Sequence, residues 1–217
     1  MTQKIIICGF PHCGTTILKS IIGHIDEVEE IHNETNKINI ETDKKYILCK
    51  SPITENIFFE DAYKDYIKIF IIRNPLFVFS SIKIKTFRNS IIKYIKTIKM
   101  FINFRNNPRK DVYTIRYEDL FENNYENLKS ILNDIGFNYN DDIFNNTKYK
   151  NIFFSGVRIS EKRPSYLNHA FYRTWQINQP FVSFNNVSNI RIKENLKQYI
   201  LNDEDISQVY PDLKTLV

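Results

Sequence analysis

The sequence predicts an α/β fold in which a central, mainly parallel sheet is flanked by helices. Short apolar segments with little polar alternation are typical of strands that are buried on both faces of such a sheet. Candidate strands of this kind cover 4–8, 46–49, 68–72 and 112–115. Helical patterns separate them, and the first candidate strand runs into a glycine-bounded loop followed by a helix. Strands that alternate with helices in this way favour a doubly wound sheet.

Helical patterns occupy the intervals between the candidate strands. We expect helices over 15–24, 55–63, 75–87, 90–104, 118–136 and 191–201. Pro75 suits the first turn of its helix, and Gly136 is typical of a residue that ends one. Between 138 and 189 the sequence is polar and aromatic without a regular pattern, so we expect an irregular segment or a lid. No repeat or linker is evident, and we predict one domain over 1–217.

Composition and charge narrow the class of protein. Hydrophobic residues make up 42% of the 217 residues, which is enough for a sizeable core. The formal net charge of +5 permits an anionic ligand but does not require nucleic acid, because basic and acidic residues are interspersed. Cys8, Cys13 and Cys49 lack metal-site spacing, which argues against zinc and against a disulfide framework.

Targeting signals are not evident in the sequence. The first apolar run is too short for a signal segment, and no apolar run is long enough to span a bilayer. We therefore expect a cytoplasmic protein with no membrane span, no metal and no nucleic-acid partner.

The loop between the first candidate strand and the first helix has the layout of an anion site. It runs from Gly9 to Thr16 with the sequence G-F-P-H-C-G-T-T. Main-chain N–H groups of such a loop and the positive end of the following helix point to one spot. Thr15 and Thr16 add hydroxyl donors. Because Thr15 stands where a Walker A loop has its lysine, hydrolysis of ATP or GTP is not expected.

A second anion site is predicted at the end of another strand. Arg73 follows the candidate strand 68–72 directly, and Ser81 lies eight residues further along the next helix. Ligands of open α/β sheets bind at the carboxyl ends of the strands, which is where this arginine falls. An isolated arginine would more often form a surface ion pair, so the combination with the loop is what favours a ligand.

Three segments together resemble the sulfotransferase family. The loop resembles its 5′-phosphosulfate loop, usually written G-x-P-[KR]-S-G-T-T. Arg73 and Ser81 resemble its 3′-phosphate motif, and I-R-Y-E-D-L at 115–120 is similar to a segment of many members. The resemblance spans residues 5 to 120. It implies a three-layer, P-loop-like fold, with 3′-phosphoadenosine 5′-phosphosulfate (PAPS) as the sulfuryl donor, adenosine 3′,5′-bisphosphate (PAP) as the product, and no metal.

The resemblance also implies roles for single residues. It assigns the 5′-phosphosulfate to His12, Cys13, Gly14, Thr15 and Thr16, the 3′-phosphate to Arg73 and Ser81, and a place near the adenine to Tyr117. A finer likeness to the tyrosylprotein and glycan branches implies that Glu34 is the catalytic base and that Lys50 approaches the leaving phosphosulfate. His32 is the second choice of base. We also expect at least one of Arg158, Lys162 and Arg163 to meet the 3′-phosphate, with Arg163 the first choice; a solvated basic loop is the alternative.

The loop departs from the family pattern at two positions. His12 stands where the family carries a permanent cation, whereas an ordinary histidine has a pKa of about 6.5. Adjacent phosphates favour the charged imidazole, so we expect His12 to act as a cation when the donor is bound. Cys13 replaces a serine, a milder change because the main-chain N–H remains. Lys50 is the first candidate to share the charge and Lys19 the second, although the expected place of Lys19 is the solvent face of its helix.

The leading interpretation is transfer of a sulfuryl group from PAPS to a hydroxyl or an amine. One alternative is a P-loop nucleotide or small-molecule kinase, which Thr15 and the lack of a Walker B-like strand ending in aspartate argue against. Another is a non-catalytic protein that retains the nucleotide site, an alternative that His12 keeps open. The acceptor is open among small molecules, glycans and peptides, and the oligomeric state is open as well.

Overall fold

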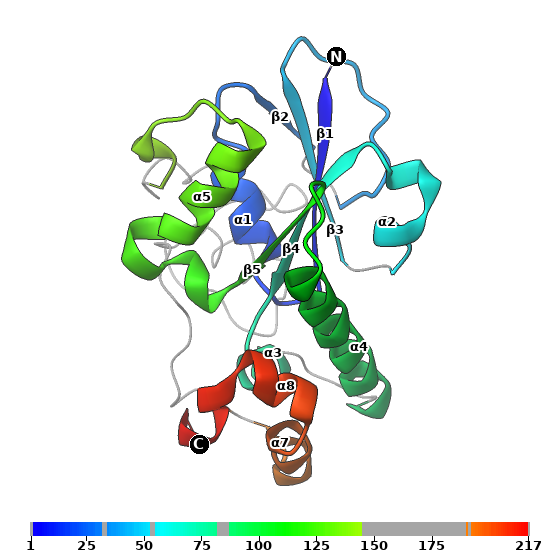
Figure 1. The fold of residues 1–217 in the computed structure, drawn as a ribbon, viewed down its shortest axis with the longest axis vertical. Helices are drawn as coiled ribbons and strands as arrows, with labels where there is room; N and C mark the ends of the chain where they lie inside the picture. The colour runs from blue at the N-terminus through cyan, green and yellow to red at the C-terminus, as the bar shows by residue number, and fades with distance from the viewer. Residues whose placement is uncertain are drawn as a thin grey trace, which may run out of the picture.

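A parallel five-stranded sheet forms the centre of the protein. The computed structural model describes residues 2–31, 34–52, 55–81, 87–144, 190 and 192–216. Within them the strand order is β2-β3-β1-β4-β5, and every neighbouring pair is parallel (Figure 1). The strands are β1 (Gln3–Gly9), β2 (Val28–Glu30), β3 (Tyr46–Pro52), β4 (Tyr66–Ile72) and β5 (Val112–Arg116). The predicted α/β class with a parallel sheet is confirmed.

Helices cover both faces of the sheet, which gives three layers. The layer on one face holds α1 (Thr15–Ile22) and α5 (Glu126–Ile135). The layer on the other face holds α2 (Asn56–Phe59) and α4 (Phe87–Asn106). The same apolar core includes α3 (Pro75–Ser81), α7 (Glu194–Leu201) and α8 (Glu204–Val209), which lie beyond the carboxyl ends of the strands in Figure 1. In Figure 1, α1 and α5 accordingly lie across the sheet from α2 and α4.

The central strand β1 shows why its sequence is apolar at every position. Ile5 and Ile7 pack into the core beside α1, while Ile6 and Cys8 pack into the core on the opposite face. All of these side chains are fully buried. Because successive residues of a strand point to opposite faces, a strand covered on both sides needs an unbroken apolar run.

The register of the strands brings the carboxyl ends together at one edge. Cys8 in β1 pairs with Ser51 in β3 and with Phe70 in β4. Ile72 pairs with Arg116 at the end of β5. The loop that follows β1, the last residues of β3 and the residues after β4 therefore meet at this edge.

Some elements differ from the sequence prediction. β2 was not predicted, because V-E-E is short and only its valine is apolar. The expected helix 55–63 is divided at Glu60, which is extended, so that Phe58 and Tyr63 on either side are both buried. The expected helix 118–136 begins as 3₁₀ turns, with Asn123 to Tyr125 in left-handed conformations, and becomes α-helical only in α5.

The C-terminal residues form elements beyond the helix expected over 191–201. That helix is α7, and α8 and a 3₁₀ turn, Pro211–Leu216, follow it. Gly136 ends α5 at φ 86°, as predicted. Residues 145–189 lie outside the described part of the chain, so the irregular segment, the lid and the single domain stay predictions. Among the residues that are described, no helix is long and apolar enough to cross a membrane.

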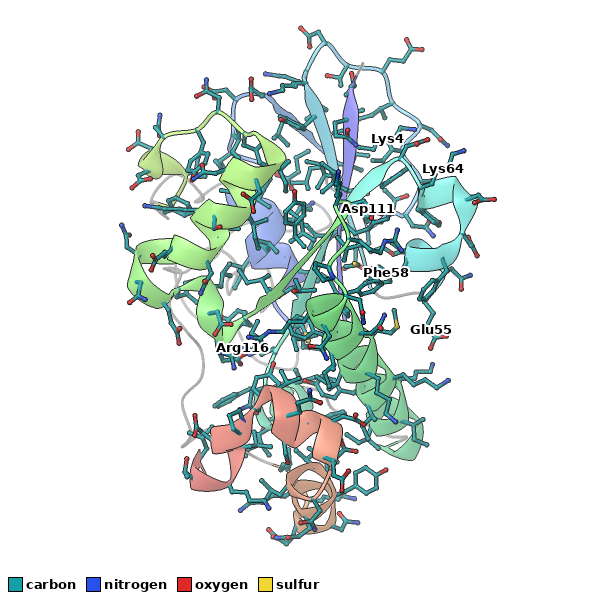
Figure 2. The ribbon with its side chains drawn as sticks, viewed as in Figure 1. Lys4, Glu55, Phe58, Lys64, Asp111 and Arg116 are labelled. Atoms are coloured by element: carbon teal, nitrogen blue, oxygen red, sulfur yellow. The ribbon has the colours of Figure 1, made fainter. Side chains whose placement is uncertain are left out.

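An ion-pair cluster stabilises the edge of the sheet opposite the strand carboxyl ends. Lys68 of β4 is 1% exposed, and its Nζ lies 2.7 Å from Oδ2 of Asp111. Arg109 Nη2 lies 2.6 Å from the same oxygen. Figure 2 shows Asp111, which precedes β5, and Arg116, which ends it, at opposite ends of the strand. The cluster therefore lies away from the edge where the loop and Arg73 meet.

We predict that Asp111→Ala lowers the free energy of unfolding by about 3 kcal/mol at neutral pH, because Lys68 is left buried without its carboxylate. Burial acts to raise the pKa of Asp111, but hydrogen bonds from Arg109 and Lys68 outweigh it and hold the pKa below the usual 3.8. The stabilisation is therefore complete above that value and is lost as the pH falls through the lower folded-state pKa. Urea titrations at neutral pH and at about pH 3 measure both effects.

A double variant separates charge burial from packing in this cluster. In Lys68→Met/Asp111→Ala no lysine charge is left buried, so most of the lost stability should return. If the double variant is as unstable as the two single changes added together, the ion pair does not account for the effect.

Candidate active site

The loop after β1 is folded tightly against the ends of β4 and β5. A Cβ added at Gly9 would lie 2.2 Å from the carbonyl oxygen of Ile71, so the loop can leave β1 in this way only from a glycine. Gly14 has φ 95°, and a Cβ there would lie 2.4 Å from the ring of Tyr117. His12 is also left-handed, at φ 69°. The main-chain N–H of Cys13 donates to the carbonyl of Phe10 at 3.1 Å, which closes the turn.

Helix α1 begins directly at this loop. Its first main-chain hydrogen bond runs from Leu18 N–H to the Gly14 carbonyl at 3.1 Å. The amides that precede Leu18 have no carbonyl within the helix to bind, and Gly14 offers no side chain to cap them. The first turn carries no acidic residue. The arrangement is that of an anion site at a helix N-terminus.

The side chain of Cys13, a residue of this loop, is fully buried. Burial raises the pKa of its thiol well above the usual value, with a smaller contribution in the same direction from Glu118. The thiol therefore stays neutral and fills space, while the main-chain N–H remains in the loop.

Lys50, Glu34 and Thr16 meet beside the start of α1. Lys50 Nζ donates to Oγ1 of Thr16 at 2.8 Å and to Oε1 of Glu34 at 2.7 Å. The lysine side chain is 6% exposed and the glutamate side chain is 49% exposed. A buried cation thus lies at the loop, and the carboxylate that it contacts is open to solvent. These three residues were predicted from separate motifs, and the fold brings them into contact.

Glu34 is placed by main-chain pairing alongside β3. Ile31 N–H donates to the Leu48 carbonyl at 2.8 Å, and Thr35 N–H donates to the Lys50 carbonyl at 3.0 Å. The hydrogen bond of Thr35 therefore holds the residue next to Glu34 against β3, beyond the end of β2. His32, the second choice of base, lies outside the described residues.

Lys19 was expected to face solvent, and this expectation was wrong. The residue is 3% exposed. Its Nζ lies 2.7 Å from Oε1 of Glu30 and 2.9 Å from the carbonyl of Ile31. It leans from α1 onto the end of β2, where it fixes the chain that leads to Glu34. The apolar neighbours of Lys19 in α1 could have indicated this burial.

Arg73 lies at the other side of the loop. It is buried, and its guanidinium carbon lies 4.3 Å from the centre of the Tyr117 ring. Its Nη1 reaches the carbonyl of His12 at 3.5 Å. Arg73 is therefore next to the loop and is not a surface arginine.

Tyr117 and Ser81 complete the predicted set on this side. Tyr117 is 1% exposed and lies beneath Gly14 and against Arg73. Ser81 is the last residue of α3. Arg158, Lys162 and Arg163 lie outside the described residues. Among those described, no group of three potential metal ligands is present.

Two residues behind Arg73, the buried Tyr94 and the partly buried Glu118, were missed by the sequence reasoning. Tyr94 of α4 donates its hydroxyl to the Arg73 carbonyl, and Glu118 accepts from the Asn74 N–H at 2.9 Å. Tyr94 is hidden in the apolar pattern of α4. Glu118 is part of the I-R-Y-E-D-L segment, which could have drawn attention to it.

Comparison with solved structures shows which fold this is. Over 99% of its length the chain is similar to mouse sulfotransferase SULT7A1 complexed with PAP, with a TM-score of 0.61, 14% sequence identity and coverage of 89% of that chain. It is also similar over 99% of its length to the sulfotransferase domain from the curacin biosynthetic pathway, with a TM-score of 0.52, 13% identity and 98% coverage. The protein has the sulfotransferase fold, and the predicted three-layer, P-loop-like architecture is confirmed. No protein-family model and no curated protein sequence matches the chain.

Proposed function

We propose that this protein transfers a sulfuryl group from PAPS to a hydroxyl or an amine of an acceptor. The observation that carries the proposal is the contact of Lys50 with both Thr16 and Glu34 at the start of α1, at 2.8 Å and 2.7 Å. A cation and a solvent-accessible carboxylate at an anion-binding loop are what this chemistry requires. The sulfotransferase fold and the PAP in the similar mouse enzyme give the donor its identity.

The residues present fit a nucleotide that carries phosphate at both its 3′ and 5′ positions. The α1 amides with Thr15 and Thr16 form one anion site, and Arg73 forms the other. The 3.5 Å contact from Arg73 Nη1 to the His12 carbonyl supports two neighbouring sites. PAPS supplies the sulfuryl group and a phosphate leaving group. Arginine suits the 3′-phosphate because its planar fork can bind two oxygens.

Glu34 and Lys50 divide the chemical work between them. Glu34 exposes its carboxylate and can accept the proton of an acceptor hydroxyl. Lys50 holds Oε1 of Glu34 in place and keeps a positive charge beside Thr16, where negative charge grows during transfer. Little reorganisation is needed, because Lys50 of β3 already contacts both Glu34 and Thr16 of α1.

Ligand selectivity tests the donor assignment. Calorimetry should show that PAP binds more tightly than adenosine 5′-monophosphate, which lacks the 3′-phosphate, and that ATP with Mg²⁺ binds weakly. Arg73→Ala should weaken PAP binding by about 2 kcal/mol and leave the monophosphate almost unaffected. Equal affinity of the wild type for the two adenosine phosphates would show that Arg73 does not bind a 3′-phosphate.

His12 is proposed to share the cationic role of Lys50. Its left-handed main chain contributes the carbonyl that Arg73 contacts, so the residue links the two anion sites. We predict that His12→Ala lowers kcat about 10²-fold, whereas His12→Arg retains most of the activity. Steady-state rates with any competent acceptor measure this, and an alanine variant as active as the wild type would leave Lys50 as the principal cation.

The acceptor is proposed to be a small molecule, a glycan or a peptide that carries a nucleophilic oxygen or nitrogen. The exposed carboxylate of Glu34 supports an acceptor that approaches from solvent.

The buried, unbridged thiols of Cys8, Cys13 and Cys49 support a reducing compartment such as the cytoplasm.

A further inference from the structure

We propose that Tyr94 and Glu118 are positioning residues that hold the main chain at Arg73 and Asn74, so that the guanidinium is aimed at the 3′-phosphate. The inference rests on the proposed function, because it assigns that phosphate to Arg73. Neither residue is placed in contact with the nucleotide. Both act on the peptide group that joins Arg73 to Asn74. Tyr94 binds its carbonyl oxygen, and Glu118 binds its N–H.

Tyr94 fixes the carbonyl of Arg73. The tyrosine is fully buried in α4, and its hydroxyl donates to this carbonyl. Burial raises the pKa of Tyr94 well above its usual value of 10.0, so the hydroxyl stays a donor at any working pH. Phe10 packs edge-on to the Tyr94 ring at 5.2 Å between ring centres. Since Phe10 belongs to the phosphate loop, Tyr94 contacts the main chain at Arg73 and a side chain of the loop.

Glu118 fixes the next amide. Its Oε1 accepts from the Asn74 N–H at 2.9 Å. The Asn74 side chain in turn accepts from the Leu76 N–H at 2.9 Å, which caps the start of α3. Glu118 is thus linked through Asn74 to the helix that carries Ser81. A negative charge near two phosphate sites is costly in itself, so a positioning role explains its presence better than a direct one.

The position of the Arg73 guanidinium depends on the conformation of the main chain at Arg73 and Asn74. The Tyr117 ring supports one side of the guanidinium, with 4.3 Å from the guanidinium carbon to the ring centre, and Nη1 reaches the His12 carbonyl. Tyr117 N–H also donates to the Ile72 carbonyl at 2.7 Å. A rotation of the peptide link between Arg73 and Asn74 would move the guanidinium off this ring and away from the loop. The hydrogen bonds of Tyr94 and Glu118 oppose that rotation.

A ratio of two affinities separates a loss of Arg73 positioning from a general loss of protein stability. We define discrimination as the dissociation constant for adenosine 5′-monophosphate divided by that for PAP, measured by calorimetry. Tyr94→Phe should lower discrimination about tenfold by weakening PAP alone. Tyr46→Phe is the matched control, because its hydroxyl also donates to a main-chain carbonyl, that of Gly136 at 2.9 Å, away from Arg73. It should lower the melting temperature to a similar degree and keep wild-type discrimination.

A second pair of variants tests Glu118. In Glu118→Ala the acceptor for the Asn74 N–H is lost, so discrimination should again fall about tenfold. In Glu118→Gln the amide oxygen can still accept this hydrogen bond, so discrimination should stay within about threefold of the wild type. This pair also keeps the test decisive if Tyr94→Phe does not fold.

The outcomes separate this inference from the proposed function. A wild type without discrimination contradicts the 3′-phosphate assignment itself. A wild type that discriminates, with Tyr94→Phe and Glu118→Ala unchanged or Tyr46→Phe equally impaired, overturns the positioning role alone. If Glu118→Gln loses as much as Glu118→Ala, hydrogen bonding to Asn74 is not the reason that Glu118 matters.

Discussion

Lys50→Met should lower kcat for sulfuryl transfer about 10³-fold, the upper end of the range for removing one preorganised electrostatic donor. Lys50 is buried and lies 2.8 Å from Thr16 Oγ1, so its charge acts in a site with little solvent screening. Methionine keeps the length and the apolar stem, and no buried charge is left unpaired, because Glu34 is half exposed. The fold should therefore be retained. Initial rates at saturating PAPS, together with a thermal melt, measure the effect.

Lys68→Met is the matched control for this experiment. Lys68 is also a buried strand lysine with a carboxylate partner at 2.7 Å, but it lies at the opposite edge of the sheet. Its replacement should change stability without changing kcat by more than about twofold. If both variants lose activity equally, the loss reflects a perturbed sheet and Lys50 has no special role in transfer.

Glu34→Gln should lower kcat about 10³-fold while PAP binding is unchanged, because an amide cannot accept the acceptor proton and the nucleotide does not depend on this carboxylate. The amide oxygen can still accept the hydrogen bond from Lys50, so the geometry around Thr16 should persist. The measurement pairs kcat with the dissociation constant for PAP. This combination distinguishes loss of a base from loss of a binding residue.

Glu41→Gln serves as the control for Glu34→Gln. Glu41 is an exposed glutamate in the same connection between β2 and β3, and its neutralisation removes the same charge from the chain. It should leave kcat and PAP binding at their wild-type values. A Glu34→Gln variant with normal kcat would mean that another group takes the proton, with His32 the next residue to replace.

The layers of this fold could be predicted because burial on both faces leaves a direct mark on the sequence. The apolar run 4–8 has no polar alternation, and in the structure Ile5 and Ile6 indeed pack on opposite faces. β2 could not be predicted in the same way. It is held at the sheet edge largely by its pairing with β3 and by the Lys19–Glu30 ion pair, which are contacts between distant parts of the sequence.

The residues of the candidate site also fall into two groups, those with a local sequence signal and those placed by contacts between distant parts of the sequence. Gly14 and Arg73 carry local signals, since one allows a left-handed loop and the other follows a strand directly. The approach of Lys50 to Glu34 depends on the main-chain hydrogen bond from Thr35 to Lys50, which a motif can suggest only through family resemblance. Tyr94 gave no signal, because a buried tyrosine in an amphipathic helix looks like any core residue until its hydroxyl is seen at the Arg73 carbonyl.

Transfer of ³⁵S from labelled PAPS tests the central claim most directly. The protein is incubated with labelled PAPS and with separate small-molecule, glycan and peptide fractions, and both the label and PAP are followed. We predict that label moves into one fraction with an equal amount of PAP formed, and that Lys50→Met and Glu34→Gln abolish the movement. Tight binding of PAPS by the wild type with no transfer to any fraction would contradict the account and indicate a protein that binds the nucleotide without turning it over.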